Sequence, residues 1–210
     1  MENFTSSVVT GNYVDNCFIE WTNEHDPTPD FTSGFSFSSL SVSDNVFLSG
    51  DVAPWFSYIV VKPHGSGHFL NGVSVGGNKF RSINGNIDRA ERVDTSFSGL
   101  NFDRSKNVFF EGNTFHNVDA VVANPLRVQH VQSSAAKTWT VDSGDALPFG
   151  GRSRGVDSVI ALGAITTSGG SSRYAMPYAD LGRGNNNDQV DLVWEEPVKG
   201  EVQLTMRMDR

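Results

Sequence analysis

The chain has 210 residues, of which 38% are hydrophobic, so it is long enough to bury a core in one large or two small domains. A formal net charge of −8 disfavours nonspecific binding to nucleic acid phosphates or to anionic membranes. The single cysteine excludes a disulfide framework within the chain, and we expect Cys17 to be a buried, inert thiol. No apolar run approaches a membrane span, and the acidic, polar N-terminus is unlike a signal peptide.

The composition favours strands and turns over helices. The chain contains 15 Phe, 4 Trp, 4 Tyr and 21 Gly residues. Aromatic side chains are enriched in strands and glycine in tight turns, whereas the usual helix formers are sparse here. The composition therefore predicts an all-β protein.

A short motif recurs four times in the first 115 residues. Each copy is an apolar strand, then Gly or Asp, then Asn, with an aromatic or β-branched residue one or two positions later. A fixed period of this length is typical of a solenoid, in which each turn buries its apolar face against the next. Three strand-like segments per period predict a parallel β-helix with long loops at residues 22–34, 62–68 and 84–91. The repeated asparagines are Asn12, Asn45, Asn78 and Asn113, which lie 33, 33 and 35 residues apart.

The repeated asparagine has two interpretations. Asn tolerates the left-handed backbone of a tight corner, and stacked Asn side chains hydrogen-bond along a solenoid axis. The alternative is a ladder of four side chains that binds a sugar. Turn chemistry favours the structural interpretation.

The pattern changes near residue 137. Alternating apolar residues and the turn clusters at 169–172 and 184–188 indicate an antiparallel sheet or small β-sandwich. We therefore predict β-helix coils at 1–136, including a strand at 126–131, and an antiparallel module at 137–210. The first repeat begins near residue 1, which indicates either a piece of a longer protein or a partner on the first coil. The strand-like segments of the module are 139–142, 158–162, 174–176, 189–194 and 201–208.

Candidate binding residues lie beside the long loops. Pyranose rings stack on exposed aromatic side chains, although coil stacking also buries such side chains. The Gly-rich loop 62–68 carries one cation and two imidazoles, which suit an anionic sugar or proton transfer, although its glycines also suit a tight turn. Two histidines without a third ligand are a weak zinc signal, and no metal site is predicted. The candidate polysaccharide-binding residues are Trp21, Trp55, Lys62, His64, His68 and Arg81.

Two acidic clusters, residues 20–26 and 88–94, have alternative interpretations. The first is either a solvated loop or a source of a carboxylate pair or metal site, with the solvated loop favoured, and the alternating signs of the second predict surface ion pairs. The chain has no phosphate loop, dinucleotide fingerprint or Gly-Xaa-Ser-Xaa-Gly motif. We therefore assign no catalytic residue and expect no cofactor.

Residues 11–23, 54–58, 112–115 and 147–152 carry a family resemblance. With them, nearly the whole chain resembles the C-terminal part of right-handed parallel β-helix proteins. These are the pectate-lyase-like, glycoside hydrolase family 28-related proteins of marine alphaproteobacteria and their phages or gene transfer agents. The resemblance implies a homotrimeric spike or fibre that contacts bacterial surface polysaccharide, together with other virion or N-terminal spike proteins. It also implies a virion or extracellular location.

The catalytic motifs of polygalacturonases in that family are Asn-Thr-Asp, Asp-Asp, Gly-His-Gly and Arg-Ile-Lys, and none occurs here. The leading expectation is therefore a virion spike or fibre protein that recognises polysaccharide without cleaving it. The alternative is a polysaccharide lyase or glycoside hydrolase acting on the same polymers, with Lys62, His64, His68 and Arg81 beside nearby carboxylates. A third hypothesis is a structural connector without a ligand. Nucleic acid and membrane are not expected as partners.

Overall fold

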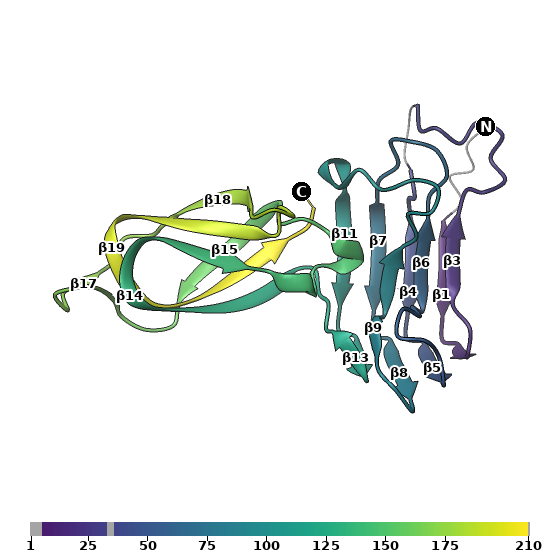
Figure 1. The fold of residues 1–210 in the computed structure, drawn as a ribbon, viewed down its shortest axis with the longest axis horizontal. Helices are drawn as coiled ribbons and strands as arrows, with labels where there is room; N and C mark the ends of the chain where they lie inside the picture. The colour runs from purple at the N-terminus through teal and green to yellow at the C-terminus, as the bar shows by residue number, and fades with distance from the viewer. Residues whose placement is uncertain (1–5, 33–35, 210) are drawn as a thin grey trace.

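The computed structural model describes residues 6–32 and 36–209 and shows an all-β protein with two parts (Figure 1). Parallel strands stack side by side into a β-solenoid of about three turns, and an antiparallel sheet follows it. The predicted fold class is confirmed. The end of the predicted loop 22–34, at residues 33 and 34, lies outside the described residues. Within the described residues, no helix has the length and apolar character needed to cross a membrane.

Successive turns of the solenoid each add one strand to sheets A, B and C, except that the last turn adds none to sheet C, and all pairs between turns are parallel. Residues 84–91, predicted as a loop, contain the strand Ile87–Arg89 and the first residue of the strand Glu91–Val93. Sheet A contains β1 (Ser7–Thr10), β4 (Leu40–Ser43), β7 (Asn71–Gly76) and β11 (Lys106–Glu111). Sheet B contains β2 (Tyr13–Asp15), β5 (Val46–Gly50), β8 (Lys79–Ile83) and β12 (Thr114–His116). Sheet C contains β3 (Ile19–Thr22), β6 (Ile59–Lys62) and β10 (Glu91–Val93), and the smaller sheet D contains β9 (Ile87–Arg89) and β13 (Val118–Ala120).

The repeated asparagines form a ladder along the solenoid axis. The Asn45 amide donates to Asn78 Oδ1 and to the Val9 carbonyl, both at 2.9 Å. Asn45 Oδ1 accepts from the backbone N–H and the amide of Asn12, at 2.9 and 3.0 Å. Asn78 bonds to Asn113 in the same way. Asn45 and Asn78 are buried, so the structural interpretation is confirmed and a sugar does not reach these amides.

The left-handed corner residue is not the ladder asparagine, which corrects the predicted turn chemistry. It is the residue before it, with φ between 56° and 68°. Gly adopts this conformation without steric cost and Asp tolerates it. The repeated Gly-Asn and Asp-Asn pairs therefore divide two tasks, because the first residue turns the chain and the second bonds between turns. The corner residues are Gly11, Asp44, Gly77 and Gly112.

The solenoid core is built from like side chains stacked in register. The Phe47 and Phe80 rings stack with centroids 5.1 Å apart, and Phe80 and Phe115 follow at 5.6 Å. The hydroxyl of the buried Tyr58 side chain donates a hydrogen bond to the Arg81 carbonyl, 2.5 Å away. Because the length of the repeat is nearly constant, an aromatic residue that packs well in one turn also packs well at the same position of the next turn.

The antiparallel sheet is organised around two long strands, β14 (Leu126–Asp142) and β19 (Gln189–Arg207). Residues 126–131, predicted as part of the solenoid, begin β14. The two segments predicted at 189–194 and 201–208 join in β19, whereas 174–176 lies between strands. The remaining strands are β15 (Gly155–Ala161), β16 (Ile165–Thr167), β17 (Ser172–Arg173) and β18 (Tyr178–Arg183), of which β15, β16 and β18 pair with β19.

The C-terminal segment caps the edge of the last solenoid turn. The buried Asp209 carboxylate accepts from the Val108 N–H and from the Asn124 amide, both at 2.8 Å. Asn124 in turn exchanges two backbone hydrogen bonds with Phe110 and accepts from the Met208 N–H. These bonds satisfy polar groups on the edge of β11 that a further strand would otherwise pair.

Two side chains differ from their predicted exposure. Cys17, expected to be buried, is exposed because it lies in the turn between β2 and β3 and not on an inward strand position. Glu91, expected in a surface ion pair, is fully buried, since β10 begins with an inward position. Its Oε1 accepts from Arg89 Nη2 at 2.7 Å and from the Phe149 N–H at 2.8 Å. Burial raises the pKa of Glu91, although the Arg89 charge opposes this.

Asn45→Ala is expected to lower the free energy of unfolding by about 3 kcal/mol, because it removes a buried side chain that hydrogen-bonds to the turns on both sides. Urea denaturation measures the change. The matched control is Asn185→Ala, an exposed turn residue, which is expected to change stability by less than about 0.5 kcal/mol. Equal effects of the two substitutions on the free energy of unfolding would contradict a stabilising role of the asparagine ladder.

Glu91→Gln is expected to remove part of the pH dependence of stability. A carboxyl group with a raised pKa binds a proton more readily in the folded than in the unfolded state. Glu91 therefore lowers the free energy of unfolding as the pH rises from about 4.5 through its folded pKa. Denaturation from pH 5 to 8 should show this decline in the wild type and in the exposed control Glu111→Gln, and a weaker decline in Glu91→Gln. An identical slope in all three proteins would contradict the assignment.

Candidate functional site

The outer face of sheet C collects charged side chains from three successive turns. Strand alternation sends Ile19, Ile59 and their equivalents into the core, and the intervening residues to the opposite face. The chain before and after these strands adds further charged and aromatic side chains. We call this surface the sheet C face, and it consists of Glu20, Glu24, Trp55, Lys62, His64, Arg92, Asp94 and Phe97.

One half of the sheet C face is built around Arg92. Its guanidinium lies 6.0 Å from the ring centroid of Trp55, whose side chain is 68% exposed. The same guanidinium pairs with Asp94 at 3.8 Å. Hydrogen bonds from the Ser96 hydroxyl and N–H lower the pKa of Asp94 and keep this carboxylate charged. The result is an exposed aromatic ring beside an anchored pair of opposite charges.

The other half is built around Phe97, which is 62% exposed. The His64 imidazole stacks on this ring with centroids 4.2 Å apart and planes at 20°. Lys62 Nζ lies 5.3 Å from the Phe97 centroid, and 3.9 and 3.6 Å from carboxylate oxygens of Glu20 and Glu24. Lys62 thus joins the two acidic residues of the first turn to the aromatic residue that follows the third.

Two nitrogen atoms on this face have unused hydrogen-bonding capacity. His64 Nε2 and Arg92 Nε are buried atoms without a partner among the described residues. Most buried polar side-chain atoms in proteins are hydrogen-bonded to protein or to water. Both nitrogen atoms are buried, so a ligand would reach either of them only if neighbouring side chains moved.

His68 has a different role from His64. Its ring is buried, with Nδ1 bonded to the Ser36 hydroxyl and Nε2 within 2.6 Å of the Pro29 carbonyl and 2.9 Å of the His64 carbonyl. These partners assign the proton to Nε2, which donates to carbonyl oxygen, while Nδ1 accepts from Ser36. His68 therefore ties residues 22–32 to the loop 62–68.

Gly65 permits the same contact between loops. Its φ is 78°, and a Cβ atom there would lie 2.3 Å from the Pro29 carbonyl carbon. Backbone of the two loops therefore touches at this point, which no other residue type allows. The glycines of the loop serve packing, and its partly buried cation, Lys62, and imidazole, His64, lie on the sheet C face.

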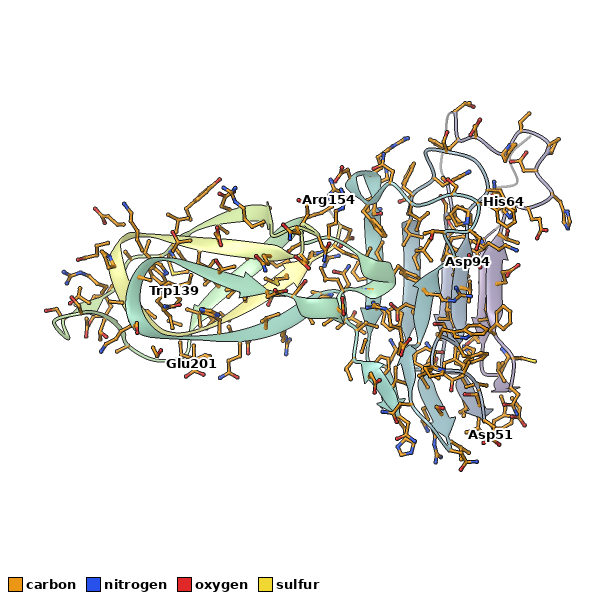
Figure 2. All side chains as sticks on the ribbon, in the orientation of Figure 1. Asp51, His64, Asp94, Trp139, Arg154 and Glu201 are labelled. Carbon is orange, nitrogen blue, oxygen red and sulfur yellow. The ribbon has the colours of Figure 1, made fainter. Side chains whose placement is uncertain are left out.

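The structure brings together three of the six residues proposed from sequence. Trp55, Lys62 and His64 lie on the sheet C face, and Figure 2 shows His64 among the loops with Asp94 beside the strand ends. The other three lie elsewhere. Trp21 packs edge-to-face on Phe37 inside the coil, His68 is buried, and Arg81 is on sheet B between Leu48 and His116.

Sequence reasoning missed Arg92, Asp94 and Phe97 as site residues. The alternating charges of residues 88–94 predict surface ion pairs and give no sign of a binding surface. Alignment of that segment with residues 59–62, one turn earlier, would have placed Arg92 and Asp94 on the face that carries Lys62. The missing information was the register between turns.

The described residues contain no group of three His, Cys, Asp or Glu side chains placed to hold a metal ion. Comparisons with family models, with curated proteins and with solved structures found no match to this chain. Functional inference therefore depends on the geometry of the sheet C face and on the resemblance described above.

His68→Ala is expected to release the contact between residues 22–32 and 62–68, because the buried Ser36 hydroxyl and the carbonyls of Pro29 and His64 lose the imidazole as their hydrogen-bond partner. Hydrogen exchange in both segments should accelerate at least about tenfold, with a fall of about 2 kcal/mol in global stability. His25→Ala, at an exposed position in the same segment, is the matched control and should leave exchange unchanged. Unaltered exchange in His68→Ala would contradict the linking role.

Proposed function

We propose that this chain is a polysaccharide-binding β-solenoid and that the sheet C face is its binding surface. The observation that carries the proposal is the pair of exposed rings, Trp55 and Phe97, each beside a cation from a neighbouring turn. Sugar rings stack on aromatic faces, and charged groups bind their hydroxyl and carboxylate substituents. A surface built from successive turns of a rigid solenoid suits an extended polymer.

The charges on this face support an acidic polysaccharide as the ligand. The two ion pairs of Lys62 are longer than 3.5 Å, and the Arg92 side chain is 35% exposed with its pair to Asp94 at 3.8 Å. Both cations therefore have capacity for a sugar carboxylate. The acidic residues Glu20, Glu24 and Asp94 supply acceptors for hydroxyl groups of the same sugar units.

We further propose that the solenoid belongs to a spike or fibre of a phage-like particle that acts outside the cell as a homotrimer. In that setting the ligand is a bacterial surface polysaccharide, and other spike or virion proteins are its structural partners. The stacked parallel turns and the family resemblance support this setting. A stable, rigid rod is the form that a fibre component requires.

A polysaccharide lyase or glycoside hydrolase acting on the same polymers is the second candidate function. The observation that favours it is the position of the Lys62 amine, 3.9 Å from the Glu20 carboxylate and 3.6 Å from that of Glu24. An amine between carboxylates is able to serve in proton transfer next to a bound sugar.

Trp55→Ala and Arg92→Ala are each expected to weaken binding of an acidic capsular or exopolysaccharide at least about tenfold, because each removes part of one stacking and charge contact. Isothermal titration calorimetry with polysaccharide from alphaproteobacteria measures the change. Tyr13→Ala, an exposed aromatic residue on sheet B, is the matched control and should bind as the wild type.

The same samples test the second candidate. Release of reducing ends or unsaturated sugars that disappears in Lys62→Ala would replace the binding function with a catalytic one. Absence of binding to every acidic polysaccharide tested, or equal binding by wild type and both variants, would overturn the assignment of the sheet C face.

A further inference from the structure

The first turn of the solenoid ends in open strand edges. Strands β1, β2 and β3 belong to this turn, which lies at the end opposite the antiparallel sheet (Figure 1), and each pairs with one strand among the described residues. Edge strands of natural proteins are often protected by Lys, Pro or a bulge that prevents further pairing. None of these three strands contains Lys or Pro, and their registers with the second turn are continuous. The first turn therefore keeps backbone groups that a further strand is able to pair.

The core side chains of the first turn are covered on one side only. Its inward residues remain partly exposed, whereas their register partners on the second turn are 0% exposed. A layer of apolar side chains on the open end would complete their burial. The first-turn residues are Val9, Val14, Ile19 and Trp21, and their partners are Val42, Phe47, Ile59 and Val61.

The asparagine ladder gives the chemistry of the missing layer. The Oδ1 atoms of Asn45, Asn78 and Asn113 each accept the backbone N–H and the amide of the asparagine one turn earlier. Asn12 is exposed, and its Oδ1 accepts from none of the described residues. Its amide donates to the Thr10 carbonyl of its own turn, because the described chain offers no carbonyl of an earlier turn. The ladder therefore stops at an accessible, unused acceptor.

We propose that the first turn is a docking surface for the last turn of a partner β-solenoid on a separate chain. An asparagine of that turn donates its N–H and amide to Asn12 Oδ1, as Asn12 does to Asn45. The partner's strands pair in parallel with β1, β2 and β3, and its apolar side chains cover the inward residues of the first turn. The contact continues the interface that the solenoid already forms between its own turns.

A second copy of this chain does not provide that turn. In each copy, Asp209 and Asn124 already occupy the edge of β11 on the last turn. Two first turns facing each other across a two-fold axis would pair their strands antiparallel, which does not continue a ladder between parallel turns. The partner is therefore a different chain. This inference rests on the proposed function for naming that chain a spike or virion protein, whereas the stacking surface itself does not.

A synthetic peptide with the sequence of residues 39–71 tests the docking surface on the full chain. These residues form one turn, which stacks on the next turn of this protein through the same ladder. Fluorescence anisotropy of the labelled peptide should give a dissociation constant below about 1 mM. Asn45→Ala in the peptide removes the amide donor, so it should weaken binding about tenfold.

Asn12→Ala in the protein removes the acceptor and should weaken peptide binding at least about tenfold. Because the two substitutions break the same hydrogen bond, both together should bind no more weakly than Asn12→Ala alone. Asn185→Ala, at an exposed turn of the antiparallel sheet, is the matched control and should bind as the wild type. Equal binding by Asn12→Ala and the wild type would contradict the ladder contact.

A fused turn keeps the test open, because a free peptide loses conformational entropy when it binds. This variant carries a copy of residues 39–71 directly before Ser6, which preserves the spacing between turns. Hydrogen exchange of the backbone amides in residues 7–22 should slow at least about tenfold relative to the wild type. Asn12→Ala in the fused protein should reverse part of this protection.

Each remaining outcome decides one part of the inference. Unchanged exchange in the fused protein would overturn the docking surface, and slower exchange without binding of the free peptide would overturn a separate chain as its occupant. Self-association of the wild type that Asn12→Ala abolishes in sedimentation velocity would assign the surface to a second copy and overturn the partner. Peptide binding without polysaccharide binding supports the docking surface and overturns only the proposed function.

Discussion

The ladder of asparagine amides is the constraint on which the rest of the solenoid depends. Each inner amide bonds to the turns on both sides, and the two central asparagines are buried. A slip of one residue between turns would leave these groups unpaired in the core, at about 1–3 kcal/mol for each. The ladder therefore sets the register, and the register decides which side chains stack inside and which lie together outside.

The sheet C face follows directly from this register. Trp55 and Arg92 are far apart in the chain, as are Lys62 and Phe97, yet each pair meets because it occupies neighbouring turns. The same stacking creates an edge at the last turn, where backbone groups of β11 need partners. Asp209 and Asn124 supply them, so the antiparallel sheet is joined to the solenoid by buried hydrogen bonds. The face and the cap are two consequences of one stacked architecture.

The candidate site shows how far reasoning from residue types extends. The loop 62–68 was recognised from its cation, imidazoles and glycines, and Lys62 and His64 lie on the sheet C face. Nothing in the loop sequence separates His64 from His68, which turns inward to Ser36. The difference arises from contact with residues 22–32, which the sequence does not place. Arg92 was hidden for a related reason, since its neighbours in space lie on other turns.

The sequence alone determined the class of fold, because a solenoid repeats its local chemistry at each turn. A period of 33 to 35 residues and the recurring Gly-Asn or Asp-Asn pair were enough to predict stacked parallel strands. Only the tertiary structure decided that Glu91 is buried and that residues 126–131 join the antiparallel sheet. Each of these depends on a contact made once, between segments without a repeat, and such contacts leave no periodic signal in the chain.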